Sequence, residues 1–299
     1  MVITMTAPCP YCYTRSLLYF QSRDYNRGVT RDLFNHYRCS KCHLIFIAPL
    51  PKNPSEYYPD SYHFIPDSAE YLEAKSAHEQ YKIDLVQQFS RHGRLLEIGP
   101  GHGSFTYLAK AAGFEVEAIE MDERCCNFLR EVVGIRAIKS DTICDALQDL
   151  DSYDVIAMWH VIEHLLDPWT TLSMISTKLK PGGILVIAAP NPDSFQFLIQ
   201  GRWWPHVDAP RHVMLIPATV LAEHLDLLGL KLELITTRDK GSLGWNTFGW
   251  SFFFSNMCSS RYLKRLAHLV GRIVAICLYP IESREGRGTA YTMIYRKVL

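Results

Sequence analysis

The stretch from Leu95 to Phe105 reads Leu-Leu-Glu-Ile-Gly-Pro-Gly-His-Gly-Ser-Phe. Its apolar start predicts the end of a buried strand, and a helix is expected to begin just after the last glycine. Between the two, glycine stands at alternate positions, Gly99, Gly101 and Gly103. Glycines let the backbone turn tightly and approach a ligand closely, and a helix N-terminus adds free N–H groups. The stretch therefore predicts a ligand-binding loop, with an ordinary structural turn as the alternative.

Strand-like runs alternate with helix-like runs on both sides of this loop. We expect strands at residues 94–98, 115–119, 135–139, 153–158, 184–188, 231–236 and 290–296. We expect helices at residues 68–90, 104–112, 123–133, 169–179 and 218–228. Alternation of this kind implies right-handed crossovers with helices on both faces of a sheet. The predicted fold is a doubly wound α/β fold with a mainly parallel, seven-stranded sheet, in which the last strand is added late.

An acidic residue, Glu120, ends the strand that follows the loop, 17 residues after Gly103. At this place a carboxylate can accept hydrogen bonds from both ribose hydroxyls of a nucleotide cofactor. A dinucleotide cofactor would also bind its ribose through an acidic residue at this place. However, the loop reads Glu-x-Gly-x-Gly-x-Gly from Glu97 and not Gly-x-Gly-x-x-Gly, which speaks against a dinucleotide.

Two further motifs follow in order, Tyr153–His164 and Leu179–Ile187, the second of which leads into Ala189-Pro190-Asn191. Together with Glu97–Gly103 they resemble the motifs of class I S-adenosylmethionine-dependent methyltransferases. Within that superfamily, the Glu163-His164 pair and the Pro190-Asn191 step resemble a branch with ubiquinone-biosynthesis O-methyltransferases and enzymes of glycan and natural-product pathways. The resemblance covers about residues 80–237 and the last strand.

The resemblance implies transfer of a methyl group from S-adenosylmethionine to O or C of a small molecule or a glycan or natural-product intermediate. It implies that Glu120 holds the ribose, Met121 packs on the adenine and Asp141 meets the adenine amino group. Trp159 and His160 are expected near the sulfonium. The full set of expected cofactor residues is Glu97, Gly99, Gly101, Gly103, Glu120, Met121, Asp141, Trp159 and His160.

Four histidines are rival candidates for a catalytic base, namely His160, His164, His206 and His212. A base is needed only if the acceptor must lose a proton during attack. The first two flank Glu163, and could instead cap a helix or pack beneath a loop. The Glu163/His164 pair could also bind a divalent ion such as Mg²⁺. The other two lie in Arg202–His212, a segment with two tryptophans that we interpret as a lid over the acceptor pocket, or else as an ordered loop.

Two cysteine pairs, Cys9-Pro-Tyr-Cys12 and Cys39-Ser-Lys-Cys42, stand 26 residues apart near the start of the chain. Four thiolates with this spacing are typical of a structural Zn²⁺ site, and buried free cysteines are the alternative. A closed site of four thiolates predicts a structural role, stabilising a zinc ribbon too small to fold alone.

These observations divide the chain. We expect a zinc ribbon at residues 1–50, a proline-rich linker and lead-in helix at 51–90, and a methyltransferase domain at 91–240 plus 288–299. Residues 241–287 form an insertion, rich first in glycine and aromatic residues and then in a basic amphipathic run at Arg261–Tyr279. The insertion is expected to be a substrate cap or a homodimer face, with peripheral membrane contact as the alternative.

Composition limits the partners. Lys+Arg and Asp+Glu are equal at 31 each, which disfavours nucleic acid as a partner. An RNA methyltransferase whose ribbon grips RNA, an NAD-dependent oxidoreductase and a non-catalytic scaffold remain as alternative functions. The chain starts without a charged segment followed by an apolar run, so no signal peptide is predicted and a cytoplasmic location is expected.

Overall fold

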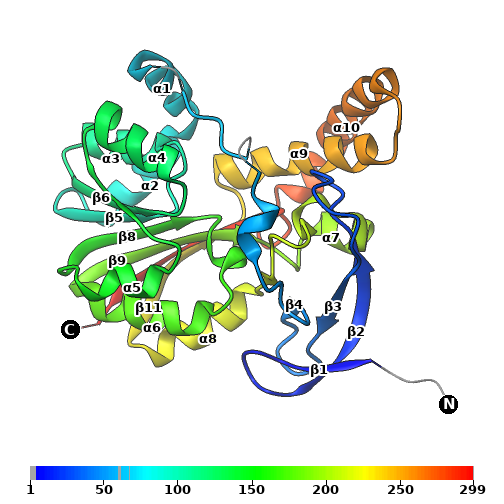
Figure 1. Cartoon of the computed structure of the whole chain (residues 1–299), viewed down its shortest axis with the longest axis horizontal. Coiled ribbons are helices and arrows are strands. Elements are labelled where there is room, and N and C mark those ends of the chain that lie inside the picture. The colour runs from blue at the N-terminus through cyan, green and yellow to red at the C-terminus, as the bar shows by residue number, and fades with distance from the viewer. Residues whose placement is uncertain (1–4, 60–61, 67, 299) are drawn as a thin grey trace.

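The computed structural model describes residues 5–59, 62–66 and 68–298. Its centre is a seven-stranded sheet in the order β11–β12–β9–β8–β5–β6–β7 (Figure 1). Neighbouring strands from β9 to β7 are parallel, and β12 runs antiparallel to both β9 and β11. The strands are β5 (Arg94–Ile98), β6 (Glu115–Glu120), β7 (Arg136–Lys139), β8 (Tyr153–Trp159), β9 (Leu179–Pro190), β11 (Leu230–Thr236) and β12 (Ala290–Lys297). The predicted mainly parallel, seven-stranded sheet is confirmed.

Helices cover both faces of this sheet (Figure 1). One face carries α2 (Gln80–Gln87), α3 (Ser104–Ala111) and α4 (Glu123–Phe128). The other carries α5 (Ile143–Gln148), α6 (Pro168–Lys178) and α8 (Ala218–Leu227). The helix expected at residues 68–90 is divided into α1 (Ala69–Ser76) and α2 by a 3₁₀ turn. No helix was predicted for α5, nor for α7 (Phe195–Gln200).

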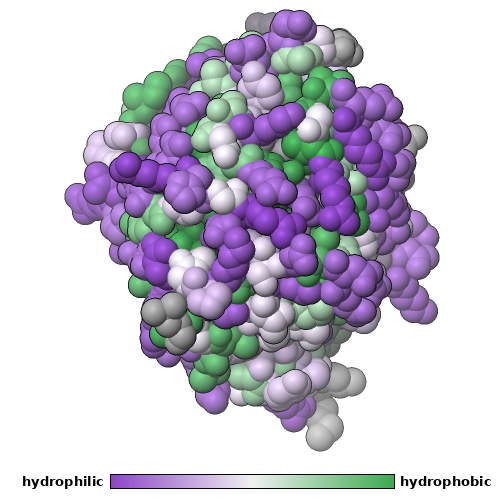
Figure 2. Space-filling model, turned by 90° about the vertical axis from the view of Figure 1, so that its left-hand side faces the viewer, coloured by the Kyte–Doolittle hydropathy of each residue, from purple (hydrophilic) through white to green (hydrophobic). Residues whose placement is uncertain are grey.

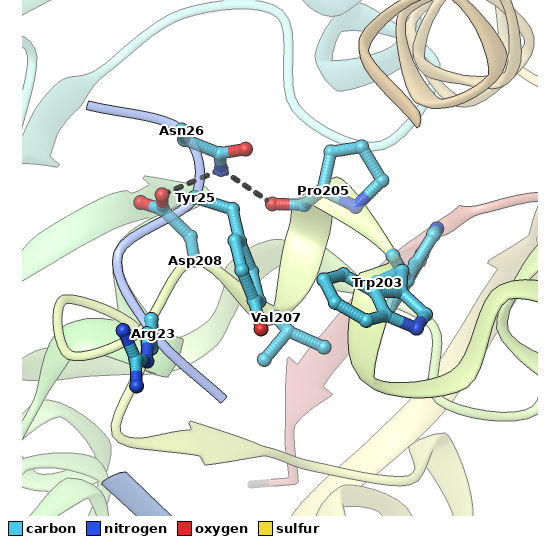
Figure 3. Close-up of a pocket in the computed structure, with 8 residues that line it drawn as sticks. Arg23, Tyr25, Asn26, Trp203, Pro205, Val207 and Asp208 are labelled. Atoms are coloured by element: carbon cyan, nitrogen blue, oxygen red, sulfur yellow. Dashed lines mark hydrogen bonds between the residues drawn. The ribbon is translucent and has the colours of Figure 1, made fainter. Parts of the chain in front are cut away.

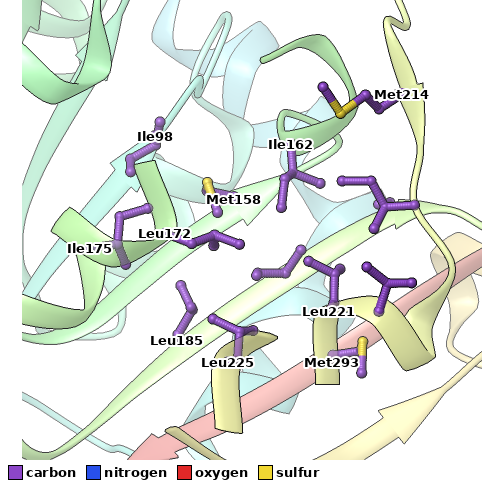
Figure 4. Close-up of a cluster of buried hydrophobic side chains, with 14 of the residues drawn as sticks. Ile98, Met158, Ile162, Leu172, Ile175, Leu185, Met214, Leu221, Leu225 and Met293 are labelled. Carbon is purple, nitrogen blue, oxygen red and sulfur yellow. The ribbon is translucent and has the colours of Figure 1, made fainter. Parts of the chain in front are cut away.

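The main core lies between the sheet and the α6–α8 face. Figure 4 shows Leu172 of α6 and Leu221 and Leu225 of α8 pointing toward the strands, and all three are fully buried. Successive residues of β5 serve opposite faces, since Leu95 packs toward α2 and α3 whereas Leu96 packs in this core. Each such side chain contributes about 1.5–3 kcal/mol by leaving water. Burial on both faces therefore fixes the register of the strands.

A second, five-stranded antiparallel sheet lies at the N-terminal end of the chain, in the order β1–β2–β3–β4–β10. We call its first four strands and their turns the ribbon. They are β1 (Thr6–Pro8), β2 (Arg15–Ser22), β3 (Phe34–Arg38) and β4 (Ile45–Ile47). The fifth strand, β10 (Met214–Leu215), comes from the segment that follows β9 in the chain. Pairing of β10 with β4 therefore attaches the ribbon to the segment of chain that follows β9 of the larger sheet.

A pair of long helices projects from the body of the protein (Figure 1). They are α9 (Lys240–Asn256) and α10 (Arg261–Glu282). The aromatic, glycine-rich part of the expected insertion is thus helical. Asp239 caps α9 by accepting a hydrogen bond from the Ser242 N–H at 2.9 Å. A Cβ on Gly249 would collide with the Gln196 side chain, so this glycine permits close packing against α7 and does not mark a turn.

Candidate active site

The glycine loop joins β5 to α3 at the carboxyl edge of the sheet. Gly99, Gly101 and Gly103 all have positive φ, at 69°, 57° and 84°. A Cβ on Gly99 would lie 2.6 Å from a methyl carbon of Val161, so both the backbone conformation and the space require glycine there. Glu97, just before the loop, is buried and accepts a hydrogen bond from the Thr106 hydroxyl. Burial raises the pKa of Glu97 to about 7, and the Thr106 hydrogen bond opposes the rise.

The Glu120 carboxylate lies at the end of the neighbouring strand β6 and faces the loop. Its Oε2 accepts a hydrogen bond from the Gly101 N–H at 2.9 Å. Its Oε1 accepts from the N–H groups of Met121 and Asp122 at 2.7 and 2.9 Å. The side chain is buried, so these backbone donors fix its orientation. The Glu120 carboxylate therefore links the glycine loop to the end of β6.

A cavity of about 450 Å³ opens beside this carboxylate. Gly99, Glu120, Met121 and Asp141 line it on one side, and His160 and His164 line it further along. Its walls come from the carboxyl ends of β5, β6, β7 and β8, where open α/β sheets bind ligands. The volume falls within the range of small-molecule and cofactor sites.

The segment before α1 forms another wall of the cavity. Tyr58, Tyr62 and His63 of this segment line it. The Tyr58 hydroxyl lies 2.9 Å from Nδ1 of His164. Prolines predict an extended linker here, and nothing in that pattern signals that its aromatic side chains reach the site. The linker therefore covers a cavity that the sequence places only on the strands and the glycine loop.

A buried carboxylate, Glu163, lies at the centre of a histidine cluster behind the cavity. Its Oε1 is 3.5 Å from His160 Nδ1 and 4.0 Å from a ring nitrogen of His212. Neither of its oxygens accepts a well-aligned hydrogen bond from the described residues. Burial alone would raise the pKa of Glu163, but the neighbouring imidazoles outweigh it and lower the pKa. His160, with φ of 58°, holds an uncommon backbone conformation that is typical of functional sites.

Backbone carbonyl groups orient two of these histidines. His164 Nδ1 lies 3.1 Å from the carbonyl oxygen of Arg211, and His212 Nδ1 lies 2.7 Å from that of His206. Because a carbonyl only accepts, each Nδ1 carries a proton, and in a neutral imidazole Nε2 is then the acceptor. One ligand atom from each of Glu163, His164 and His212 lies within 4.8 Å of the others. Three potential ligand atoms therefore converge in this cluster.

Some residues predicted for the site lie outside the cavity lining. Trp159 packs against Phe105, with ring centroids 5.3 Å apart, on the side of the sheet covered by α2 and α3. His206 is buried between Trp204 and Trp245, at 4.8 and 5.3 Å between centroids. Burial lowers the pKa of His206 to about 3, which makes it a weak base. The cavity lining also does not include Glu97, Gly101, Gly103 and His212.

Trp245 connects the projecting helices to the site. Its ring centroid lies 5.1 Å from that of His160 and 5.3 Å from that of His206. The residue belongs to α9, so an element far along the chain reaches the end of β8. Aromatic richness of the segment is the sequence signal for this contact.

An ion-pair network ties the ribbon to the segment between α7 and β10. The Arg211 guanidinium donates hydrogen bonds to both oxygens of Asp24, at 2.6 and 3.1 Å. It also donates to both oxygens of Asp208, at 2.8 and 2.9 Å. All of this arginine's side chain is buried. The Arg202–His212 segment, predicted to be a lid, is therefore held by the ribbon.

Figure 3 shows a close-up of the small cavity that the ribbon and the Arg202–His212 segment line together. The Asn26 side-chain amide donates to the Pro205 carbonyl and to Asp208, both at 2.6 Å. Tyr25 packs against Trp203, with ring centroids 4.7 Å apart. The exposed Trp203 thus contacts the ribbon, whereas Trp204 is buried.

The four paired cysteines converge at one end of the ribbon. Sγ distances are 3.4 Å for Cys12–Cys39, 3.6 Å for Cys9–Cys42 and 3.7 Å for Cys12–Cys42. Tetrahedral zinc with Zn–S bonds of about 2.3 Å requires sulfurs about 3.8 Å apart. The N–H groups of Lys41 and Cys42 point at Cys39 Sγ at 3.4 and 3.5 Å, as they do for a thiolate ligand. The cluster fits a structural zinc site.

Comparisons with known proteins agree with this geometry. A family model described as a methyltransferase domain matches residues 71–235. A ubiquinone biosynthesis O-methyltransferase of Cereibacter sphaeroides is 29% identical over 159 residues, which are 51% of this chain and 64% of that protein. The chain thus spans less than two thirds of that relative's length.

Two solved structures share the fold. A SAM dependent methyltransferase from Archaeoglobus fulgidus has a TM-score of 0.50 at 23% identity, covering 77% of this chain and 95% of that one. Phosphoethanolamine N-methyltransferase 2 of Haemonchus contortus has a TM-score of 0.54 at 14% identity, covering 85% and 62%. With the family model matching more than half of its residues, the chain belongs to the methyltransferase domain family.

Proposed function

We propose that this protein is an S-adenosylmethionine-dependent methyltransferase that acts on O or C of a small molecule, such as a glycan or natural-product intermediate. The observation that carries the proposal is the cavity at the carboxyl edge of the sheet, with Glu120 on one side and His160 on the other. The named relative, an O-methyltransferase, supports a small-molecule acceptor. The balanced charge of the chain gives nucleic acid no attractive surface overall.

The residues that line the cavity would hold the cofactor. Glu120 would accept hydrogen bonds from the ribose, and Gly99 lets the backbone approach closely. Met121 and Asp141 line the cavity where the adenine would lie. The cofactor supplies the activated methyl group, so the protein's task is to align the acceptor and exclude water. Tyr58 and Tyr62 of the linker line the cavity and would help to exclude water.

His160 is the favoured base among the four histidines, because it lines the cavity and burial lowers the pKa of His164, the other histidine of the lining, to about 4. Glu163, 3.5 Å from His160 Nδ1, would hold the proton on that nitrogen. The other ring nitrogen could then take a proton from an acceptor hydroxyl. In this arrangement Glu163 is a positioning residue. His206 is disfavoured because of its burial and low pKa.

The donor set around Glu163 does not fit Mg²⁺. This ion prefers six oxygen ligands, whereas the cluster offers one carboxylate and two imidazoles, from His164 and His212. Imidazole with carboxylate would suit a transition ion such as Zn²⁺ or Mn²⁺. The orphaned Glu163 oxygens agree equally well with a role in orienting His160.

Metal analysis distinguishes a metal site at Glu163 from a role of Glu163 in orienting His160. We expect about one zinc per chain, bound by the four cysteines and retained in the Glu163→Gln variant. For protein that keeps its zinc, methyl transfer is expected to be the same without Mg²⁺ as with added Mg²⁺. Mass spectrometry measures the metal content of the purified parent protein and of Cys39→Ser, which should contain less zinc if the four cysteines bind it. A second equivalent of metal that disappears in Glu163→Gln and in His212→Ala would place an ion in the histidine cluster instead.

Replacing Glu120 by alanine is expected to weaken S-adenosylmethionine binding by about 10–100-fold, since hydrogen bonds to a charged group contribute about 1.5–3 kcal/mol. Titration calorimetry with S-adenosylmethionine, and with NAD⁺ for comparison, measures the effect. Glu123→Ala, an exposed carboxylate three residues on that pairs with Arg130, is the matched control and should bind as the parent does. Unchanged affinity in Glu120→Ala, or tighter binding of NAD⁺ than of S-adenosylmethionine, would refute the cofactor assignment.

A further inference from the structure

The outward face of α10 is covered by large apolar side chains. This 22-residue helix packs on α9 through small residues, Ala267, Gly271 and Ala275, which are buried. A Cβ on Gly271 would lie 2.5 Å from Ser251 Cα, so the two backbones approach closely. The larger side chains therefore point away from α9. Those that are exposed are Tyr262, Leu263, Leu266, Leu269, Val270, Ile273, Ile276, Tyr279 and Ile281.

These residues form a continuous stripe. Leu266, Leu269, Ile273 and Ile276 are spaced by three, four and three positions, which places them on one face of a helix. They are at least half exposed, and Ile276 reaches 73%. An ordinary surface helix would turn such a stripe toward the core. Exposed apolar patches of this kind mark a surface that binds a partner.

Basic side chains run along one edge of the stripe. Arg261, Arg265 and Arg272 are exposed and follow each other at helical spacing. The one acidic residue of α10, Glu282, is buried and accepts a hydrogen bond from Trp250 Nε1 at 2.8 Å. The exposed surface of α10, all of whose residues are described, thus combines apolar and positive groups with no negative one.

We propose that α10 lies flat on an anionic phospholipid membrane, with the stripe of Leu266, Leu269, Ile273 and Ile276 in the acyl boundary and the arginines at the headgroups. Charge complementarity selects this occupant, because apolar residues beside arginines match a lipid surface that is apolar below and negative above. A second copy of the chain would bring the same arginines without an acidic group on the helix to pair with them. No described helix is long and apolar enough to span a bilayer, which agrees with binding in the plane of the surface.

The position of α10 suits this role. Figure 1 shows α9 and α10 projecting from the body, so the helix can reach a flat surface without obstruction by the sheets. The opposite end of the molecule differs, since Figure 2 shows mainly hydrophilic residues with hydrophobic ones scattered among them. Trp245 of α9 contacts His160, so the helix that supports α10 also reaches the candidate active site. The membrane contact does not depend on the proposed reaction.

Vesicle sedimentation tests the proposal with the full chain. The protein is expected to sediment with vesicles of phosphatidylcholine containing roughly one third phosphatidylglycerol, and to be released by high salt. Leu269→Glu with Ile273→Glu should weaken binding by at least about 100-fold, because it places charges in the acyl boundary. Arg265→Gln with Arg272→Gln should weaken it by about 25-fold, from about fivefold per charge.

The matched control is Leu227→Glu with Leu232→Glu, which changes two exposed leucines of α8 and β11 and should leave vesicle binding unaltered. Circular dichroism and the melting temperature establish that each variant is folded. Failure of the parent protein to bind the anionic vesicles would overturn the proposal, as would equal binding to phosphatidylcholine alone. Light scattering identifies the rival occupant, since a dimer lost in Leu269→Glu, without vesicle binding, would assign the stripe to a second copy.

Discussion

Replacing Arg211 by methionine is expected to lower the free energy of unfolding by about 3–5 kcal/mol. The guanidinium is fully buried and pairs with two carboxylates, those of Asp24 and Asp208. Methionine fills a similar volume but leaves both acids buried without their cation. A broken buried pair is costly for this reason, even where replacing the whole cluster by apolar residues would not be.

The free energy of unfolding lost in Arg211→Met should depend on pH in a defined direction. Burial alone would raise the pKa of Asp208, but the Arg211 hydrogen bonds outweigh it and lower the pKa to about 2. The pKa of Asp24 is lowered by the same partner against the same effect of burial. Stability from these lowered pKa values is present above the ordinary aspartate value near 3.9 and is lost as pH falls through the folded-state values. Without Arg211, burial acts unopposed, so the variant's deficit should be largest near neutral pH and shrink as the acids become protonated.

Urea denaturation of the parent and Arg211→Met proteins, from neutral pH down to about pH 4, measures both effects. Arg202→Met is the matched control, because this nearby arginine is exposed and stacks on Trp203, and its loss should cost less than about 0.5 kcal/mol. Equal stability of the parent and Arg211→Met at neutral pH would show that the network does not support the fold. A deficit that grows as pH falls would show that the carboxylates are not its source.

Much of the central sheet follows from local pattern, and the parts that do not are those fixed by pairing. Alternating apolar runs and turns mark each strand, and Glu120 lies where the strand pattern ends. The position of β12 between β9 and β11 depends on backbone hydrogen bonds between distant residues, which no local pattern records. The pairing of β10 with β4 is set in the same way.

The candidate site shows the same division. The glycine loop and the histidines near Glu163 stand in recognisable motifs, so they could be named from the sequence. Tyr58 and Tyr62 could not, since the prolines around them indicate a spacer and their side chains reach the cavity only in the folded chain. The sequence does not predict helix α9, because its glycines lower helix propensity; close packing against Gln196 explains one of them, Gly249.

Removing the zinc that we propose at the four cysteines is expected to unfold the ribbon while the seven-stranded sheet persists. Structural zinc contributes about 10–16 kcal/mol of apparent binding energy in small zinc-finger peptides, and that energy is folding energy. The ribbon strands are short, and β1 and β4 have only three residues each. Cys39→Ser should therefore remove hydrogen-exchange protection from β1–β4 and leave β8 protected.

Cys277→Ser is the control, since this cysteine is exposed and outside the cluster. Ribbon amides that stay protected in Cys39→Ser, in protein free of zinc, would contradict the site. The consequence reaches the active site through the backbone, because the Ile47 N–H donates to the Val213 carbonyl and the Val213 N–H donates to that of Glu163, both at 2.9 Å. Loss of the ribbon frees His212 and Glu163 but leaves Glu120 and the glycine loop in place. Cofactor binding should therefore survive zinc removal while methyl transfer fails, which is the result that would assign the ribbon to positioning the histidine cluster.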